Sequence, residues 1–325
     1  MDSFKNLTTF KVGGTVARVE RPESAEVFLT TLGRLAGTPF MILGGGSNVL
    51  VNDAAYAGTV VIPSFSRIEF TDDTVTADAG ASWDALVHAA VSRGLWGIEN
   101  LSSIPGTVGG AVVANIGAYG AALSDTLVSV DVYDVAQGLQ RTLSKDECES
   151  GYRMSIFKKE PERYAILRAH MRLCRTPRPN LAYRDLAEHF AGEAAPTIFA
   201  IRAAVIGIRA AKFPNLTEFG TAGSFFLNPI ITEGEAARIR TRFPGMPLFS
   251  LPEGGIKVPL AWIFDHATDV RGMREGGAFI WPAQLLVIAT EQDARARDVR
   301  TLAERIAQEV KEKTEIEIFT EVRIL

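Results

Sequence analysis

Two glycine-rich segments near the N-terminus constrain this chain more than any other feature. The first spans residues 44–48 and follows the apolar run 40–43, and the second spans 104–110 and is followed by 115–120. Glycine has no Cβ, so such loops can bring backbone N–H groups directly against the phosphates of a ligand. The pair predicts a diphosphate site with these contacts: Gly44, Gly45, Gly46, Ser47, Asn48, Ile104, Pro105, Gly106, Gly109, Gly110, Gly117, Tyr119 and Gly120.

Neither loop matches a common nucleotide-binding motif. The G-x-G-x-x-G spacing fails after Gly44 and Gly46 because Val49 stands where the third glycine belongs. No Walker lysine follows either segment, which argues against nucleoside triphosphate hydrolysis. The sequence therefore predicts a diphosphate held by loops alone, without a Rossmann helix. The alternative is a pair of ordinary tight turns.

Composition narrows the class of protein. Of the 325 residues, 47% are hydrophobic and 22% charged, and the formal net charge is −4. This balance is typical of a globular protein of two or three domains. Basic residues are spread out, so no nucleic-acid partner is expected, and no apolar run is long enough for membrane insertion. Two cysteines and four scattered histidines predict a cytoplasmic, thiol-reduced chain without a metal site.

Hydrophobic periodicity and capping residues predict the main elements. Helices are expected at 24–35 behind Ser24, at 83–93 behind Ser82, and at 198–211, 233–243, 260–266 and 293–313. Strands are expected around 12–19 and at 40–43, 59–62, 75–80, 129–133, 165–173 and 316–325. The stripe of Val299, Leu302, Ile306 and Val310 in the last long helix indicates a core-facing surface.

Three places outside the loops carry residues capable of chemistry. Arg153 lies in a mixed polar and apolar stretch, Ser224 follows small residues and precedes two phenylalanines, and Glu321 and Arg323 share one face of the predicted last strand. Each has a plainer interpretation: a surface ion pair for Arg153, a turn hydroxyl for Ser224, and the solvated side of an edge strand for Glu321 and Arg323. The G-x-S-x-G elbow is absent, so a nucleophilic serine is a poor fit.

Six motifs in one order resemble a known family. They are GGGSN at 44–48, IPGTVGG at 104–110, NIGAYG at 115–120, YRxSIFK at 152–158, GSFFxNP at 223–229 and EVR at 321–323. The chain resembles the UDP-N-acetylenolpyruvoylglucosamine reductases, the flavoenzymes of peptidoglycan precursor synthesis. Tyr183 and the GSFF phrase resemble the branch of the family that keeps a tyrosine-bearing substrate loop.

The resemblance implies an α+β protein with an FAD-binding fold of the vanillyl-alcohol-oxidase type and a smaller α+β substrate domain. The expected divisions are two FAD-binding subdomains (1–65 and 66–212), a substrate domain (213–314) and a returning C-terminal strand (315–325). The resemblance also implies that NADPH reduces non-covalently bound FAD and leaves. The enolpyruvyl sugar nucleotide then accepts hydride at C3 and a proton at C2, giving UDP-N-acetylmuramate.

The resemblance assigns roles to individual residues. When hydride adds to an alkene conjugated with a carboxylate, negative charge develops on the carboxyl group. The resemblance implies that Arg153 and Glu321 stabilise this charge. Ser224 is the implied proton donor, since a weak acid can still protonate a strongly basic carbon. The implied substrate contacts are Tyr183, Lys212, Asn228, Lys257, Gln284 and Arg323. The segment 279–284 departs from the family's histidine-bearing turn.

Two alternatives stay open from the sequence. One is an FAD-dependent oxidase of small alcohols or lactones on the same fold, although the first glycine loop lacks the histidine that tethers FAD in many of those enzymes. The other is a non-catalytic sugar-nucleotide binder. A monomer with only small-molecule partners is expected.

Overall fold

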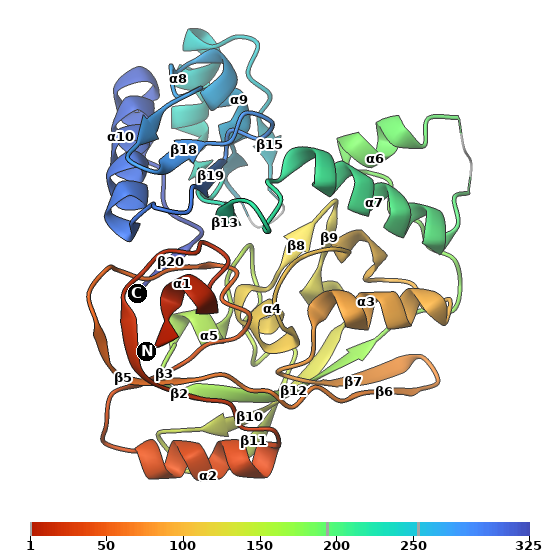
Figure 1. Ribbon diagram of the computed structural model, residues 1–325. Helices are drawn as coiled ribbons and strands as arrows, with labels where there is room; N and C mark the ends of the chain where they lie inside the picture. The colour runs from red at the N-terminus through yellow and green to blue at the C-terminus, as the bar shows by residue number, and fades with distance from the viewer. Residues whose placement is uncertain (1, 193–194, 252–253) are drawn as a thin grey trace. The chain divides into compact units, whose positions relative to one another are not determined.

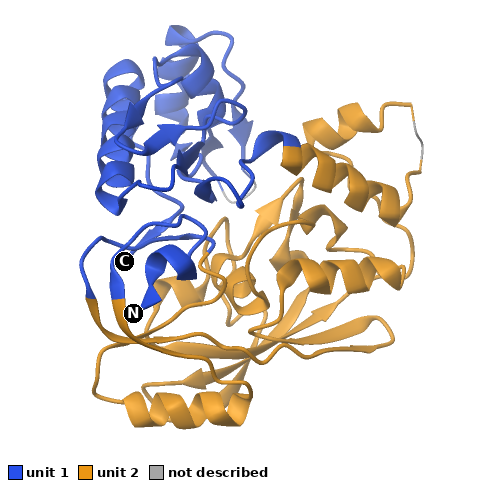
Figure 2. Ribbon diagram, in the orientation of Figure 1, with its two compact units in different colours: residues 1–15, 47–55, 211–325 blue, residues 16–46, 56–210 orange. Residues whose placement is uncertain are grey.

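The computed structural model describes residues 2–192, 195–251 and 254–325. The chain forms two compact units, shown in Figure 2. Unit 1 comprises residues 1–15, 47–55 and 211–325, and unit 2 comprises residues 16–46 and 56–210. Unit 1 is therefore assembled from three separate stretches of the chain.

Unit 2 contains helices on both sides of sheet structure. Its helices are α2 (Ala25–Leu35), α3 (Trp83–Ser92), η1 (Glu99–Leu101), α4 (Val108–Ala114), η2 (Leu123–Asp125), α5 (Ile156–Lys159), α6 (Arg184–His189) and α7 (Ile198–Lys212), the last ending in unit 1. Its strands are β3 (Phe40–Ile42), β5 (Tyr56–Val61), β6 (Ile68–Thr71), β7 (Thr74–Asp78), β8 (Gly117–Ala118), β9 (Ala121–Ala122), β10 (Leu127–Asp134), β11 (Leu139–Ser144) and β12 (Tyr164–Arg172), together with β2 (Thr15–Glu20), whose first residue belongs to unit 1.

Two sheets organise unit 2. Strands β2, β5 and β3 run parallel, with β5 in the middle. An antiparallel sheet follows in the order β11-β10-β12-β7-β6. Helix α2 lies on the side of β10 and β11, while α3 and α4 lie on the opposite side (Figure 1). Phe28 of α2, Val75 of β7 and Trp83 of α3 belong to one buried cluster, so the sheets and helices share a core.

Unit 1 has a smaller α+β arrangement. Its helices are α1 (Phe4–Leu7), α8 (Glu233–Arg242), α9 (Leu260–His266) and α10 (Ala296–Thr314). Its strands are β1 (Asp2–Ser3), β4 (Val49–Leu50), β13 (Gly220–Ser224), β14 (Ile230–Ile231), β15 (Phe249–Ser250), β16 (Ile256–Lys257), β17 (Arg274–Glu275), β18 (Ala278–Ile280), β19 (Val287–Thr290) and β20 (Arg323–Ile324). The main sheet has the order β13-β19-β18-β17, and β14, β16 and β15 form a second one.

Local capping explains where the predicted helices begin. Ser24 Oγ accepts the Val27 N–H at 3.1 Å at the start of α2, and Ser82 Oγ accepts the Ala85 N–H at 3.4 Å at the start of α3. A serine oxygen in this position satisfies a backbone donor that the helix itself cannot pair. The serine caps that the sequence predicted for both helices are confirmed.

The last long helix confirms its predicted core stripe but starts later than expected. Val299, Leu302, Ile306 and Val310 are all fully buried. The helix begins at Ala296 rather than Asp293 because the Asp53 carboxylate accepts the N–H groups of Ala296 and Arg297, at 2.9 and 3.0 Å. This cap comes from a distant part of the sequence, so no local pattern could reveal it.

The C-terminal strand is shorter than the sequence predicted. Only Arg323–Ile324 forms a strand, which pairs in parallel with β4, while Thr320 makes one isolated bridge to Phe226. Glu321 and Val322 form a bend. The prediction that Glu321 and Arg323 share one face of a strand is therefore wrong, because period-two alternation applies only within continuous extended backbone.

Candidate active site

The two glycine-rich loops lie against each other inside unit 2. The first follows strand β3, which pairs in parallel with β5. A Cβ built on Gly45 would lie 2.6 Å from the Cα of Gly106, and one on Gly44 would lie 2.7 Å from Thr107 Oγ1. Real Cβ atoms do not approach other atoms this closely, so the contact requires glycine at both positions. Two loops that are 56 or more positions apart in the sequence thus make one surface of nearly bare backbone.

The second loop leads into a helix that the sequence analysis did not predict. Thr107 is the N-cap of α4, and its Oγ1 accepts the Gly110 N–H at 3.3 Å. The N–H groups of Val108 and Gly109 donate to Ala81 O and Ala79 O at 2.9 and 2.8 Å. The expectation of loops alone is therefore wrong for this half of the site. The paired glycines 109 and 110 lower helix propensity, which hid the helix from local pattern analysis.

The start of the second loop is held by a partly buried ion pair. Arg202 of α7 binds both carboxylate oxygens of Asp84 at 2.7 and 2.8 Å, and Asp84 Oδ1 also accepts the Ser103 N–H at 2.6 Å. Burial alone would raise the pKa of Asp84, but the bonds from Arg202 and Ser103 outweigh it and hold that pKa below its usual value. Ser103 has a φ of +60°, so these bonds stabilise a strained backbone.

The NIGAYG segment is fixed by two asparagines that the sequence analysis missed. Asn100 Nδ2 donates to Tyr119 O at 2.7 Å and to Asn180 O at 2.8 Å, and Asn180 Nδ2 donates to Gly120 O at 2.9 Å. Tyr119 has a φ of +48°, which side-chain-bearing residues rarely adopt. No short motif surrounds Asn100 or Asn180, and only the fold shows that they serve this loop.

Tyr119 links the loop to helix α7 and to Tyr183. Its hydroxyl pairs with the guanidinium of Arg209, which also donates from Nε to Ser103 O at 3.2 Å. Burial raises the pKa of Tyr119 to about 12, so the phenol stays protonated at neutral pH. The rings of Tyr119 and Tyr183 meet edge to face, with centroids 5.2 Å apart. Arg209 is a second residue that the sequence analysis missed.

Arg153 also lies beside the NIGAYG segment. A Cβ on Gly117 would lie 3.1 Å from Arg153 Nη1, so glycine there leaves room for the guanidinium. The surrounding stretch is tied to α4, because Ser155 Oγ donates to Val113 O at 2.7 Å and Asn115 Nδ2 donates to Gly151 O at 2.8 Å. Lys158 Nζ donates to Arg153 O at 3.0 Å. These hydrogen bonds thus fix the backbone of the YRxSIFK motif, which carries Arg153.

Ser224 and Glu321 come together in unit 1. Ser224 ends β13, pairs with Val287 of β19 and follows Gly223, whose φ is +79°. The Glu321 N–H donates to Phe225 O at 2.8 Å, which places the bend carrying Glu321 directly beside the serine. Asn48 of the first loop reaches the same segment: its O accepts the Arg323 N–H at 3.1 Å, and its Nδ2 lies 3.5 Å from Glu321 O.

The predicted substrate contacts lie on several elements. Lys257 pairs with Ile230 and Phe249 in the three-stranded sheet, and its Nζ lies 5.7 Å above the Phe249 ring. Asn228 Oδ1 accepts the Leu260 N–H at 2.9 Å, so this oxygen starts helix α9. The remaining four occupy the following places: Gln284 in the turn before β19, Arg323 in β20, Lys212 at the end of α7, and Tyr183 at the N-cap of α6.

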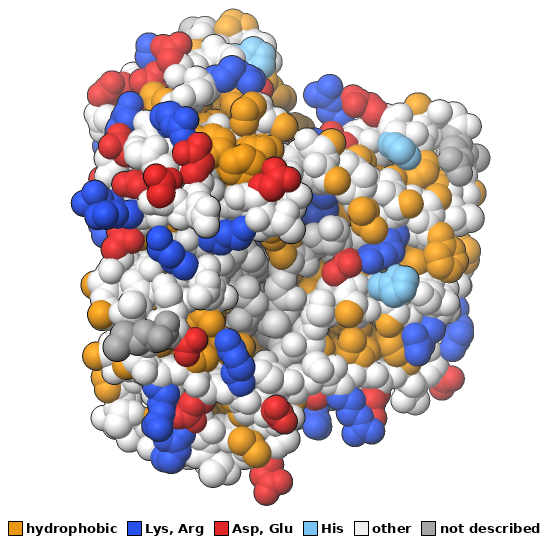
Figure 3. Space-filling model, viewed as in Figure 1, with side chains coloured by type: hydrophobic (Ala, Val, Ile, Leu, Met, Phe, Trp, Pro, Cys, Tyr) orange, Lys and Arg blue, Asp and Glu red, His pale blue; other side chains and the backbone are white. Residues whose placement is uncertain are grey.

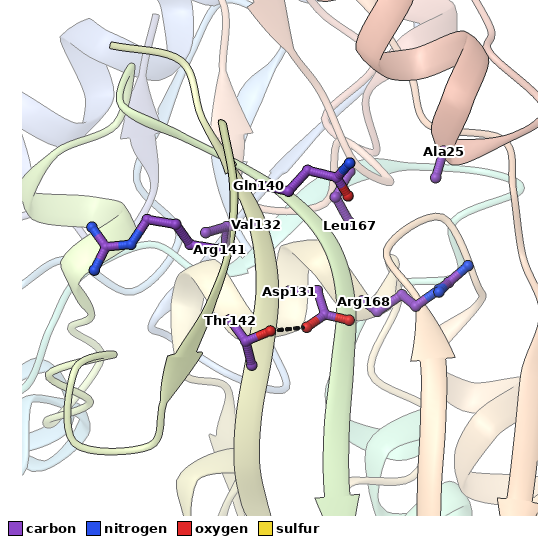
Figure 4. Close-up of a pocket in the computed structure, with 8 residues that line it drawn as sticks. All are labelled: Ala25, Asp131, Val132, Gln140, Arg141, Thr142, Leu167 and Arg168. Carbon is purple, nitrogen blue, oxygen red and sulfur yellow. Dashed lines mark hydrogen bonds between the residues drawn. The ribbon is translucent and has the colours of Figure 1, made fainter. Parts of the chain in front are cut away.

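A separate cavity of about 290 Å³ lies where α2 faces the antiparallel sheet of unit 2 (Figure 4). Asp131 accepts a hydrogen bond from Thr142 at 2.7 Å and pairs with His170 at 2.9 Å, and Arg168 Nε donates to Asp78 at 2.9 Å. None of the predicted site residues lines this cavity. Its polar groups satisfy one another, so it has the features of sheet surface rather than of the candidate site.

Charged side chains of both signs are mixed on the surface. On the face seen in Figure 3, lysine and arginine side chains lie among aspartates and glutamates rather than in a patch of one sign. Throughout residues 2–192, 195–251 and 254–325, every helix is too short or too polar to cross a lipid bilayer.

Comparisons with known proteins first define a class. Residues 16–144, which include both glycine-rich loops, match the FAD binding domain family. The chain is therefore a flavoprotein of α+β fold. Residues 215–325 match the C-terminal domain of UDP-N-acetylenolpyruvoylglucosamine reductase. The chain belongs to the UDP-N-acetylenolpyruvoylglucosamine reductase family.

Individual relatives support this membership. The reductase of Pseudomonas aeruginosa is 37% identical over 293 residues, covering 88% of this chain and 86% of the relative. That of Escherichia coli is 35% identical over 330 residues, covering 99% and 95%. The crystal structure of the enzyme from Thermus caldophilus aligns with a TM-score of 0.68 at 26% identity, covering 99% of this chain and 97% of the other. The fold class expected from the sequence is confirmed.

Proposed function

We propose that this protein reduces UDP-N-acetylglucosamine enolpyruvate to UDP-N-acetylmuramate, with FAD as cofactor and NADPH as reductant. The reaction is a step of peptidoglycan precursor synthesis. Family membership supports the activity, and one structural observation supports the assignment of its residues. This observation is the 2.8 Å hydrogen bond from Glu321 N to Phe225 O, which joins the backbone of Glu321 to that of the residue after Ser224.

The glycine cradle is the proposed FAD site. Gly44, Gly45 and Gly106 meet without intervening side chains, so the cofactor's pyrophosphate can approach the backbone N–H groups of both loops. The helix that starts at Thr107 holds the second loop in place, because its first N–H groups donate to Ala81 O, Ala79 O and Thr107 Oγ1. Tyr119 and its supporting asparagines define the next segment along the site. When bound, FAD carries hydride from NADPH to C3 of the enolpyruvyl group.

Ser224 is the proposed proton donor. Hydride arrival at C3 leaves an electron pair on C2 that is delocalised into the adjacent carboxylate. Transfer of the hydroxyl proton from Ser224 Oγ to C2 forms the C–H bond and leaves an alkoxide, which solvent reprotonates. A serine hydroxyl suits this role because the accepting carbon is a strong base.

Arg153 and Glu321 are the proposed stabilisers of the developing charge. Arg153 supplies a fixed positive charge from an anchored segment, and preorganised charge costs no rearrangement when the reaction occurs. Glu321, whose backbone N–H binds the carbonyl of the residue after Ser224, supplies a carboxyl group as hydrogen-bonding partner. Tyr183, Lys212, Asn228, Lys257, Gln284 and Arg323 are the proposed contacts to the sugar nucleotide.

Further assignments rest on the same reasoning. The exposed Tyr183, packed edge to face on Tyr119, supports membership of the branch with a tyrosine-bearing substrate loop. We propose two FAD-binding subdomains (1–65 and 66–212), a substrate domain (213–314) and a C-terminal segment (315–325). A monomer acting in the cytoplasm is also part of the proposal, because NADPH and nucleotide sugars are small soluble substrates.

The substitution Ser224→Ala tests the proposed proton transfer. Flavin reduction by NADPH should proceed within about twofold of wild type, whereas reoxidation by the enolpyruvyl substrate should slow by about 10²–10⁴-fold, the usual range for loss of a positioned acid. Stopped-flow absorbance of the flavin measures each half-reaction separately. Ser64→Ala, at an exposed loop serine, is the control and should alter neither rate. Equal slowing of both half-reactions by Ser224→Ala would refute the role.

A further inference from the structure

The main sheet of unit 1 has two different faces. Ala278, Ile280 and Ile288 point into the hydrophobic core that also contains residues of α10. Side chains alternate along a strand, so Phe279 of β18 and Val287 and Ala289 of β19 point to the opposite face. Val287 and Ala289 are fully buried but belong to neither hydrophobic cluster. Residues of this second face are thus buried apart from the hydrophobic cluster that contains α10.

Trp281 lies on the same face as Ser224, two strands away. Ser224 pairs with Val287, and the Trp281 N–H donates to Val287 O at 2.9 Å. This bond continues the register in which Ile280 faces Ile288. Directly opposed residues of antiparallel strands project to one side of the sheet. With strands about 4.8 Å apart, the backbone of Trp281 lies about 10 Å from that of Ser224.

The indole of Trp281 belongs to a small aromatic cluster. Its ring centroid lies 5.4 Å from that of Phe219 and 6.2 Å from that of Phe279, and all three side chains are only partly buried. The backbone turn that follows is fixed by Pro282 and by the Gln284 N–H, which donates to Trp281 O at 3.2 Å. The ring is thus held in place by packing, with part of its surface left open.

The indole N–H is a donor without an acceptor in the described part of the chain. Trp281 Nε1 is shielded from solvent and makes no hydrogen bond there. Buried donors are nearly always paired, because an unpaired one loses its bonds to water without replacement. A ligand oxygen that reached this nitrogen would supply the missing acceptor.

We propose that Trp281 is a substrate-contact residue of this enzyme, with its N–H donating to a diphosphate oxygen of the sugar nucleotide. The inference rests on the proposed role of Ser224, because it starts from the carbon that Ser224 protonates. In this substrate the diphosphate and the enolpyruvyl group are attached to different carbons of the hexose, so the diphosphate lies across the sugar from that carbon. The aromatic cluster supplies an apolar wall for the sugar, and the indole N–H supplies a directional bond beyond it.

Two substitutions separate the ring from its N–H. Trp281→Phe keeps an aromatic ring and removes only the donor, so the Kd for UDP should rise about 3–10-fold, as expected for one lost hydrogen bond. Trp281→Leu removes both, and its Kd should rise further. Calorimetric titration of the FAD-loaded enzyme with UDP measures these constants. The KM for the enolpyruvyl substrate should rise in parallel, while the limiting rate of flavin reduction at saturating NADPH stays within about twofold of wild type.

The control is Trp262→Phe. Trp262 stacks on His266 in helix α9, with ring centroids 4.4 Å apart. Its substitution should leave the Kd for UDP unchanged. Thermal unfolding of each variant checks folding, and Trp281→Phe keeps the test valid if Trp281→Leu does not fold. If a folded Trp281→Phe variant has an unchanged Kd and KM, the inference is overturned. In that case turnover by the wild-type enzyme still upholds the proposed function. Absence of turnover in the wild type would instead refute the proposed function.

Discussion

Glu321 is placed by its backbone rather than by a strand. Its N–H binds Phe225 O, and the neighbouring Arg323 N–H binds Asn48 O, so the residue is fixed between the serine-bearing strand and the first glycine loop. These two bonds fix the backbone at and just after Glu321, the residue that carries the proposed carboxyl group.

Glu321→Gln tests the carboxyl group itself. The amide keeps the size and one hydrogen-bonding oxygen but loses the acid, so we expect flavin reoxidation by the enolpyruvyl substrate to slow by roughly tenfold to a hundredfold, less than in Ser224→Ala. Single-turnover stopped-flow gives this rate. Glu317→Gln is the matched control, since Glu317 is exposed and pairs with Lys311, and the rate of this variant should equal wild type. A Glu321→Gln rate equal to wild type would remove Glu321 from the mechanism.

Individual residues also show what the sequence could and could not predict. Gly44, Gly106, Arg153 and Ser224 could be proposed as site residues from the sequence because they occur in contiguous motifs. Asn100, Asn180 and Arg209 were missed because each serves a loop from a distant position, without a local pattern of its own. Long-range hydrogen bonds of this kind become visible only once the fold brings their partners together.

At the scale of elements, the loop-to-loop contact is the most sensitive part of the cofactor site. Gly45→Ala would place a Cβ 2.6 Å from the Gly106 Cα, so the backbone of one loop must shift. Strain of about 1–3 kcal/mol is typical for overpacking, which corresponds to a loss of FAD affinity of about 5–150-fold. Fluorescence titration of the apoprotein with FAD measures the change.

Gly33→Ala is the control for this substitution. Gly33 lies within α2 and nothing stands within 4 Å of an added Cβ. Alanine there should leave FAD binding unchanged and stabilise the protein by about 0.5–1 kcal/mol. Thermal unfolding of both apoproteins separates a folding defect from a binding defect. Wild-type affinity for FAD in Gly45→Ala would contradict the proposed cradle.

Elements with strong local signals were predictable, and the exceptions have physical causes. Helices α2 and α3 follow from their serine caps and apolar spacing, and α9 follows from apolar spacing alone. Helix α4 was missed because glycines 109 and 110 lie in its first turn, and the start of α10 because Asp53 caps it from afar. The last strand was predicted too long because its partner, β4, has only two residues.

At the scale of the whole molecule, one unit is built from three stretches of sequence. Residues 1–15 and 47–55 fold with 211–325, so the first glycine loop passes from unit 2 into unit 1 between Gly46 and Ser47. A division of the sequence into consecutive segments cannot describe a unit that is built from separate stretches. The same short loop therefore carries glycines of the proposed cofactor site and Asn48, whose side chain reaches the backbone of Glu321.

The most direct test of the whole account is a pair of anaerobic half-reactions on the purified wild-type enzyme. One equivalent of NADPH should bleach the visible absorbance of the bound flavin. Adding UDP-N-acetylglucosamine enolpyruvate should then restore the colour and yield one equivalent of UDP-N-acetylmuramate. A flavin that NADPH does not bleach, or whose colour returns only when oxygen is admitted, would contradict the account.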